Sequence, residues 1–108
     1  MPRSISVTRA VEFSETDAAG IVHFSNYFRW MEAAEAALFE SLGIPLLYVE
    51  NGSPHGYPRV ATECQFLAPV HFRDRVKIDL EIVRVRSSAI EYRFLFQRLD
   101  PDGPVDVA

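Results

Sequence analysis

Few residues of this 108-residue sequence suit disulfide or metal chemistry, because it has one cysteine and three histidines. Cys64 alone cannot form an intrachain disulfide, and the histidines lack the spacing of a metal site. No apolar run is long enough for a secretion signal or a membrane span. The formal net charge of −4 leaves no basic surface for nucleic acid. We therefore expect a cytoplasmic protein without a metal, a membrane span or a nucleic-acid partner.

Apolar residues are plentiful, since 48% of the chain is hydrophobic and the aromatic residues comprise eight Phe, four Tyr and one Trp. A chain of this length forms one small domain, here residues 1–108. The aromatic content is high for one small core. We therefore expect some apolar surface to remain for contacts with partner subunits.

Apolar and polar residues alternate along four segments, which is the period-two pattern of a half-buried strand. The segments are residues 5–13, 60–69, 76–85 and 90–97. The pattern changes phase at Ile82–Val83, which predicts a bulge. Short turns after residues 69 and 85 predict that the last three strands form an antiparallel meander.

Apolar residues recur at helical spacing over residues 24–42 and predict one long helix. Gly43 can adopt the left-handed conformation that ends a helix, and Pro45 cannot continue one. Residues 43–58 are rich in Pro and Gly and predict a loop. A strand, a long helix and then several strands predict an α+β fold, with the helix on one face of an antiparallel sheet.

Four polar or reactive residues have more than one interpretation. Glu35 falls within the apolar arc of the predicted helix, so it lies at the edge of that arc, meets a cation or contacts a partner subunit. Cys64, at an apolar strand position, behaves as a small buried hydrophobe unless it is a thiolate. Arg84 and Arg86 are either solvated strand residues or part of a site for an anion.

Asp17 is the strongest candidate for a functional residue. It lies too far before the predicted helix to be its N-cap, and small residues with Gly20 follow it, leaving room for a ligand to approach the backbone. A carboxylate beside the free amides of a helix start can attack a carbonyl or activate water, while the amides stabilise the oxyanion. Asp17, His23 and Ser25 are too close in sequence to converge as a hydrolytic triad.

The segment TDAAGIVHFSNYFRWMEAAEAALFESLGIP, residues 16–45, resembles the signature of the 4-hydroxybenzoyl-CoA thioesterase family of hotdog-fold proteins. Its pattern D-x-x-G-x-V-x-x-x-N-Y-x-R, followed by an acidic helix residue, is met here. The matching residues are Asp17, Gly20, Val22, Asn26, Tyr27, Arg29 and Glu32. A second segment, ECQFLAPVHFRD, resembles the family's strand that ends in an apolar-Pro step and an acidic turn.

The resemblance implies a hotdog fold, in which a curved antiparallel β-sheet wraps a long central helix. It further implies a homodimer or a homotetramer with active sites between subunits. The implied reaction is hydrolysis of an aryl- or short-acyl-CoA thioester to free acid and CoA. Asp17 would be the nucleophile or general base, the backbone N–H of Phe24 would polarise the carbonyl, and Gly20 would clear space.

By the same resemblance, His23 and Tyr27 contact the acyl group. The CoA phosphates would be held by the RVRSS segment, through Arg84, Arg86, Ser87 and Ser88. No cofactor is implied, because CoA is part of the substrate. The family's final strand should follow residues 104–108. Either the native chain continues, or a partner supplies this strand, or the fold is incomplete, and we expect the first. An alternative function is a non-catalytic acyl-CoA binding module, and a hotdog dehydratase is less well matched.

Overall fold

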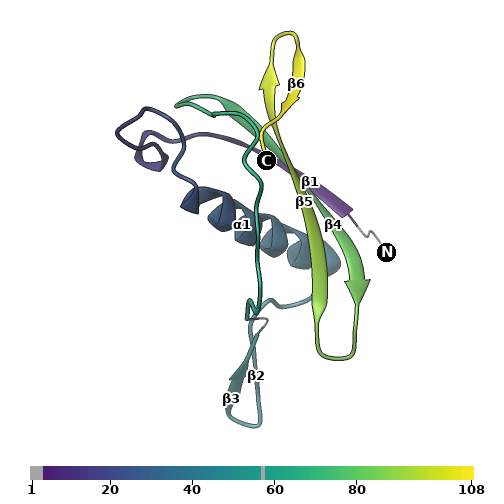
Figure 1. Cartoon of the computed structure of the whole chain (residues 1–108). Coiled ribbons are helices and arrows are strands. Elements are labelled where there is room, and N and C mark those ends of the chain that lie inside the picture. The colour runs from purple at the N-terminus through teal and green to yellow at the C-terminus, as the bar shows by residue number, and fades with distance from the viewer. Residues whose placement is uncertain (1–3, 57) are drawn as a thin grey trace.

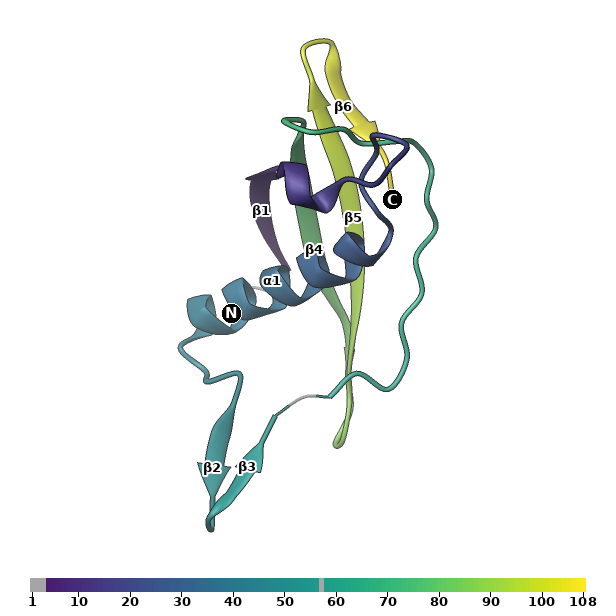
Figure 2. The same ribbon diagram turned by 90° about the vertical axis from the view of Figure 1, so that its left-hand side faces the viewer.

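The computed structural model describes residues 4–56 and 58–108 (Figure 1). Its elements are β1 (Ser4–Ala10), a 3-10 turn η1 (Phe13–Glu15), α1 (Ser25–Leu42), β2 (Tyr48–Glu50), β3 (Ser53–His55), β4 (Arg75–Val85), β5 (Ile90–Asp100) and β6 (Gly103–Asp106). In the described part of the chain, four strands form one sheet in the order β1-β4-β5-β6, and every neighbouring pair is antiparallel. The single long helix crosses one face of this sheet (Figures 1 and 2), as the predicted α+β architecture requires.

Helix α1 begins one residue after the predicted start and ends at the predicted residue. Its buried side chains recur at helical spacing and include Trp30, Ala34 and Leu38, which are fully buried. Gly43 ends the helix with φ +68°, and its N–H donates to the Glu40 carbonyl at 3.1 Å. The left-handed C-terminal residue was therefore predicted correctly from the Gly-x-Pro sequence.

The hydrophobic core lies between α1 and the inner face of the sheet. On β4, alternate residues Val76, Ile78 and Leu80 are fully buried, whereas the intervening residues remain partly exposed. Phe96 of β5 and Trp30 of α1 meet in the same layer with ring centroids 6.3 Å apart. Burial of each such side chain contributes roughly 1.5–3 kcal/mol to the stability of the fold. The alternation that predicted β4 therefore also decides which face of the strand packs against α1.

The predicted bulge is confirmed. The pairing register between β4 and β5 shifts between Ile82 and Arg84, where Tyr92 and Glu91 are the partners on β5. One extra residue on β4 moves the following side chains to the opposite face. This shift explains why the apolar positions changed phase along β4.

The predicted strand over residues 60–69 is wrong. This segment runs as an extended chain alongside the molecule (Figure 2) but belongs to no strand among the described residues. Near its end, the N–H groups of Leu67 and Ala68 both point at the Val107 carbonyl, at 2.8 and 3.4 Å. A period-two pattern favours extended backbone, but a strand also needs a partner that supplies a hydrogen-bond ladder, so no three-strand meander forms here.

Two further predictions need correction at their boundaries. Strand β1 ends at Ala10 rather than Phe13, because residues 12–15 turn into the 3-10 element η1. The predicted loop over residues 43–58 contains the small hairpin β2–β3, turned by Asn51 and Gly52 at positive φ. Residues 103–106 form β6, which pairs with β5 on the edge of the sheet. No helix of residues 4–56 and 58–108 is long and apolar enough to cross a membrane.

Candidate active site

A β-bridge and two backbone hydrogen bonds close the turn that carries Asp17. At its base, residues Thr16 and Val22 form an antiparallel bridge. Within the turn, the Asp17 N–H donates to the Ile21 carbonyl, and the Gly20 N–H donates to the Asp17 carbonyl, each at 2.9 Å. Gly20 has φ +83°, a conformation that a residue with a Cβ rarely adopts. The sequence Asp-Ala-Ala-Gly therefore forms a tight turn that projects from the helix start.

The Asp17 carboxylate lies on the surface of this turn and caps no helix. Its Oδ1 accepts a hydrogen bond from the Ala19 N–H at 2.9 Å, which is the local bond that turn aspartates commonly make. Its Oδ2 accepts no hydrogen bond from any residue that the structure describes. One oxygen thus fixes the carboxylate in place, and the other is available to a ligand.

The start of α1 presents an unused backbone donor. Phe24 is the N-cap residue and has helical backbone angles. Its N–H has no hydrogen-bond acceptor among residues 4–56 and 58–108, whereas the next two N–H groups donate to His23. An unpaired amide at a helix start carries the positive end of the helix dipole. This donor is suited to bind an oxyanion.

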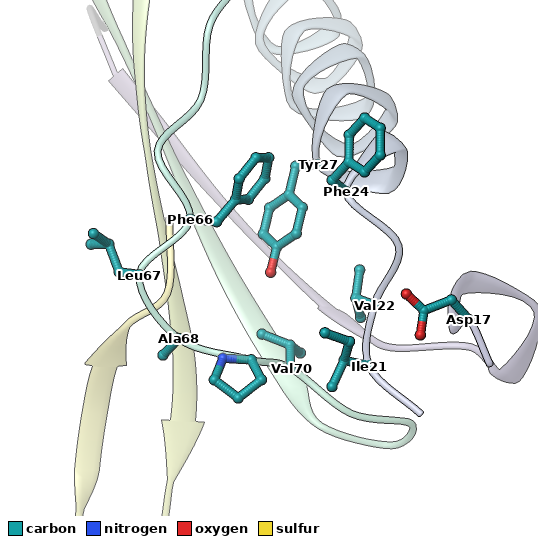
Figure 3. A pocket seen from close by; sticks show the side chains of 10 residues that line it. Asp17, Ile21, Val22, Phe24, Tyr27, Phe66, Leu67, Ala68 and Val70 are labelled. Atoms are coloured by element: carbon teal, nitrogen blue, oxygen red, sulfur yellow. The ribbon is translucent and has the colours of Figure 1, made fainter. Parts of the chain in front are cut away.

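Asp17 and Phe24 line the same open hollow, which has a volume of about 410 Å³ (Figure 3). The other walls are apolar or aromatic: Ile21, Val22, Tyr27, Phe66, Leu67, Ala68, Pro69 and Val70. Phe66 packs edge-on against Tyr27, with ring centroids 5.1 Å apart. The hollow therefore combines one carboxylate and one free amide with walls that suit a flat apolar group.

Tyr27 contributes a phenol to this hollow. The residue is only 3% exposed, and Figure 3 shows its hydroxyl directed toward the Val70 side of the hollow. The hydroxyl makes no hydrogen bond with any residue of the described chain. Burial, and secondarily the charge of Cys64, raise the pKa of Tyr27 to about 12. The phenol is therefore a neutral hydrogen-bond donor at physiological pH.

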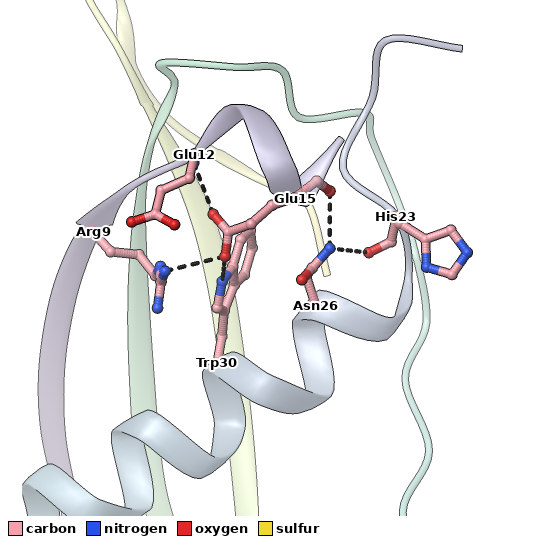
Figure 4. Close-up of polar contacts among 6 residues, drawn as sticks. All are labelled: Arg9, Glu12, Glu15, His23, Asn26 and Trp30. Atoms are coloured by element: carbon pink, nitrogen blue, oxygen red, sulfur yellow. Dashed lines mark hydrogen bonds and ion pairs between the residues drawn. The ribbon is translucent and has the colours of Figure 1, made fainter. Parts of the chain in front are cut away.

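A buried polar cluster, which sequence reasoning missed, lies beneath the Asp17 turn (Figure 4). The Glu15 carboxylate is bonded to the side chains of Trp30 and Arg9. The Glu15 carbonyl accepts hydrogen bonds from the Asn26 side chain and from the His23 N–H. The sequence feature that could have indicated this cluster is Arg9, a charged residue at an apolar strand position and six residues before a glutamate.

His23 and Ser25 contact each other but not Asp17. The Nδ1 atom of His23 lies 2.8 Å from Ser25 Oγ, and the His23 ring packs on the exposed Phe24 ring at 4.5 Å. No hydrogen bond or ion pair joins either residue to Asp17 in the described chain. The three residues form no triad, as expected. His23 is also not among the residues that line the hollow.

The predicted CoA-binding residues are not near Asp17 within one chain. Residues 84–88 occupy the tip of the β4–β5 hairpin and are all exposed. Strand β4 starts beside the Asp17 turn, where the Val11 N–H donates to the Asp74 carbonyl, and runs away from it (Figures 1 and 2). Eleven residues at about 3.3 Å each place the tip roughly 35 Å further along the strand.

Glu35 meets a cation, which was one of three interpretations of its place on the helix. Arg59 donates to both of its carboxylate oxygens, at 3.0 and 3.2 Å. The Glu35 side chain is 5% exposed and the Arg59 side chain 35% exposed. The bond to Glu35 raises the pKa of Arg59 above its ordinary value. Cys64 is a free, half-buried thiol whose pKa is raised by burial, in agreement with a small hydrophobic role.

Comparison with known proteins gives the same family from sequence and from structure. The family model of the thioesterase-like superfamily matches residues 11–108. The 4-hydroxybenzoyl-CoA thioesterase of Pseudomonas sp. (strain CBS-3) is 34% identical, over 99% of this chain and 77% of its own. The 1,4-dihydroxy-2-naphthoyl-CoA hydrolase of Synechococcus sp. (strain CC9311) is 35% identical, over 94% of this chain and 74% of its own.

A solved structure supports the same relationship. A 4-hydroxybenzoyl-CoA thioesterase mutant, crystallised in complex with 4-hydroxybenzoyl-CoA, superposes with a TM-score of 0.84. The two chains are 27% identical, and the match covers 98% of this chain and 78% of the other. The architecture of helix and sheet is therefore shared over nearly the whole described chain.

Proposed function

This chain belongs to the thioesterase-like superfamily and is a thioester hydrolase with the hotdog fold, and from that premise we propose that it hydrolyses aryl-CoA thioesters to the free acid and CoA. The proposed substrates resemble 4-hydroxybenzoyl-CoA, because relatives at 34% and 35% identity carry the names of hydrolases of benzoyl- and naphthoyl-CoA compounds. The apolar hollow beside Asp17 has walls that suit such a ring.

The observation that carries this proposal is the pairing of a carboxylate with a free amide on one hollow. Asp17 Oδ2 and the Phe24 N–H both lack partners among the described residues, and both residues line the hollow. A thioester whose carbonyl oxygen accepts from Phe24 would expose its carbonyl carbon to the carboxylate. The negative charge that develops on the oxygen would then be stabilised by this N–H and by the helix dipole.

Asp17 has two possible roles that the geometry accommodates equally. As a nucleophile, it would add to the carbonyl carbon and expel CoA as a thiolate, leaving a mixed anhydride that water then hydrolyses to the acid and the free carboxylate. As a general base, it would take a proton from water as the water oxygen attacks the carbonyl, and the proton would leave with the CoA sulfur. Gly20 does not line the hollow, and a Cβ there would meet nothing within 4 Å, so its role is the positive φ of the Asp17 turn and not the clearing of space.

The aryl group would lie against the exposed Phe24 and Phe66 rings, which contact each other edge-on with centroids 6.3 Å apart, and beside Tyr27. Edge and face contacts of this kind are worth about 0.5–1.5 kcal/mol each beyond area burial. The neutral Tyr27 phenol would donate to a polar substituent on the ring. His23 packs on Phe24 and would support that ring from outside rather than line the hollow itself.

The complete site would require a second copy of the chain. Residues 84–88 supply two arginines and two serines suited to phosphates, but they lie at the far end of the hairpin from Asp17. A homodimer that brings this tip to the partner's Asp17 turn would complete the site, and pairs of dimers could form a homotetramer. The cations would also offset the net charge of −4 that repels an anionic substrate.

Replacing Asp17 by Asn tests the proposal directly. The substitution keeps the shape of the side chain and removes its charge, so we expect kcat for 4-hydroxybenzoyl-CoA to fall by roughly 10²–10⁴-fold. The melting temperature should change by less than about 2 °C, because the carboxylate is exposed and makes only a local bond. Release of free thiol from CoA thioesters measures the rate.

Two controls separate the possible outcomes. Asp106→Asn changes another exposed carboxylate, on β6 at the sheet edge, and should leave the rate unchanged. A wild-type protein that binds acyl-CoA but hydrolyses none of a panel of aryl and aliphatic thioesters would instead be a binding module. Near-normal turnover by the Asp17→Asn variant would show that another group performs the reaction.

A further inference from the structure

The buried carboxylate of Glu15 has more partners than any other acidic side chain in the described chain. Its Oε2 accepts from Trp30 Nε1 at 2.8 Å and from Arg9 Nη2 at 3.1 Å, and its Oε1 accepts from the Glu12 N–H at 2.8 Å. The residue is 8% exposed and Trp30 is completely buried. The carboxylate is therefore held by three donors from three places in the fold: Arg9 on β1, Glu12 at the N-cap of η1 and Trp30 on α1.

The backbone carbonyl of Glu15 binds the far end of the Asp17 turn. The Glu15 carbonyl accepts from the His23 N–H at 2.9 Å and from Asn26 Nδ2 at 2.8 Å. Asn26 is 5% exposed and also donates to the His23 carbonyl at 3.2 Å. Glu15 thus connects the start of the turn, its end and the first turn of α1 (Figure 4).

The two groups assigned to the reaction both lie next to this cluster. Asp17 is two residues after Glu15, and Phe24 is one residue after His23, whose N–H is bonded to Glu15. The relative position of the carboxylate and the amide therefore depends on bonds made by one residue. A displacement of about 1 Å between reacting groups can lower a rate by about 100-fold.

We propose that Glu15 is a positioning residue, which holds the Asp17 turn against the start of α1 so that the carboxylate and the Phe24 amide face one substrate. This inference rests on the proposed function and goes beyond it, because Glu15 touches neither the hollow nor the substrate. A purely structural ion pair would make the same contacts. It would affect the stability of the fold but not the rate of the folded enzyme.

The main test is the Glu15→Gln variant, assayed at a temperature where urea titration shows it to be folded. An amide of the same shape can accept at one oxygen but presents an N–H₂ group to donors at the other. We expect kcat for 4-hydroxybenzoyl-CoA to fall by roughly 10–100-fold, with KM within about threefold of wild type, because the walls of the hollow are unchanged. The Trp30→Phe variant loses one donor to Glu15 and also leaves a cavity in the core. It is assayed under conditions where urea titration shows it to be folded, and its kcat loss should be smaller.

A matched control is the Glu35→Gln variant, which breaks the other buried Glu–Arg pair, further along the same helix. It should lose comparable stability and keep its kcat. The decisive measurement is the double variant with Asp17→Asn. If Glu15 acts through Asp17, Glu15→Gln should lower the remaining rate by less than about threefold in that background.

The outcomes distinguish this inference from the proposed function. Unchanged kcat in both Glu15→Gln and Trp30→Phe would overturn the positioning role, and so would losses that multiply fully with Asp17→Asn. Equal kcat losses in Glu15→Gln and Glu35→Gln would indicate a general structural effect and also overturn it. A wild-type protein without thioesterase activity would refute the proposed function itself.

Discussion

The Glu35–Arg59 pair is expected to hold the long connection after α1 onto the helix. The perturbation is Arg59→Met, which keeps an apolar stem of similar length but leaves the Glu35 carboxylate, only 5% exposed, without its cation. Removing one partner of a buried ion pair costs about 3–5 kcal/mol. Since the Arg59 side chain is 35% exposed, water weakens the pair, and we expect a loss of about 2–3 kcal/mol.

The size of this loss can be converted into a shift in melting temperature. At about 2.1 cal/mol/K per residue, a chain of 108 residues has an unfolding entropy of about 0.23 kcal/mol/K. The Arg59→Met variant should therefore melt roughly 10 °C below wild type. Urea unfolding at one fixed protein concentration gives the free energy directly. Trp30 is the sole tryptophan and is completely buried, so its fluorescence reports the transition.

Two further variants show whether the unpaired carboxylate causes the loss. The double variant Glu35→Leu with Arg59→Met removes both charges and should return to within about 1 kcal/mol of wild type. Arg93→Met breaks a weak, exposed contact with Glu81 at 3.9 Å and should change stability by less than about 0.5 kcal/mol. A loss below about 1 kcal/mol for Arg59→Met, or a double variant as unstable as the single one, would refute the reasoning.

Two other predictions concern substrate binding and pH. Arg86→Ala should raise KM for CoA thioesters about tenfold, with little effect on a pantetheine thioester that lacks the nucleotide, and equal effects on both would place the phosphates elsewhere. For Tyr27, folding raises the pKa from 10.0 to about 12, so the unfolded chain loses this proton first and the protein should lose stability as the pH rises from 10 to 12. The Tyr27→Phe variant should lack this part of the decline in alkaline urea titrations, and an identical decline in both proteins would contradict the burial of the phenol.

Hydrophobic patterns along the chain predicted the helix and the strands that bury one apolar face. The helix over residues 24–42, its end at Gly43 and the bulge near Ile82 are each properties of a few neighbouring residues, and the structure confirms them. The strand predicted over residues 60–69 failed because a strand also needs a neighbour, and alternation alone does not specify one. The hairpin of residues 48–55 was missed because strands of three residues are too short to show a period.

The candidate site also has one part that could be predicted from the sequence and another that could not. Asp17, Gly20 and the helix start could be proposed from residues 15–30 alone, because a tight turn and its helix are local. The walls supplied by residues 66–70 and the cluster of Arg9, Glu15 and Trp30 could not. These contacts join residues far apart in sequence, and a side chain's partner depends on how the elements pack.

The sequence by itself determined the family, the central helix and the turn that presents Asp17, since each follows from short-range preferences of the backbone and from a local motif. The tertiary structure alone decided that Glu15 has three donors, that Glu35 is neutralised by Arg59 and that residues 84–88 lie at the far end from Asp17. The physical reason is that the stability of a buried charge depends on the groups that replace its water, and only packing brings those groups together.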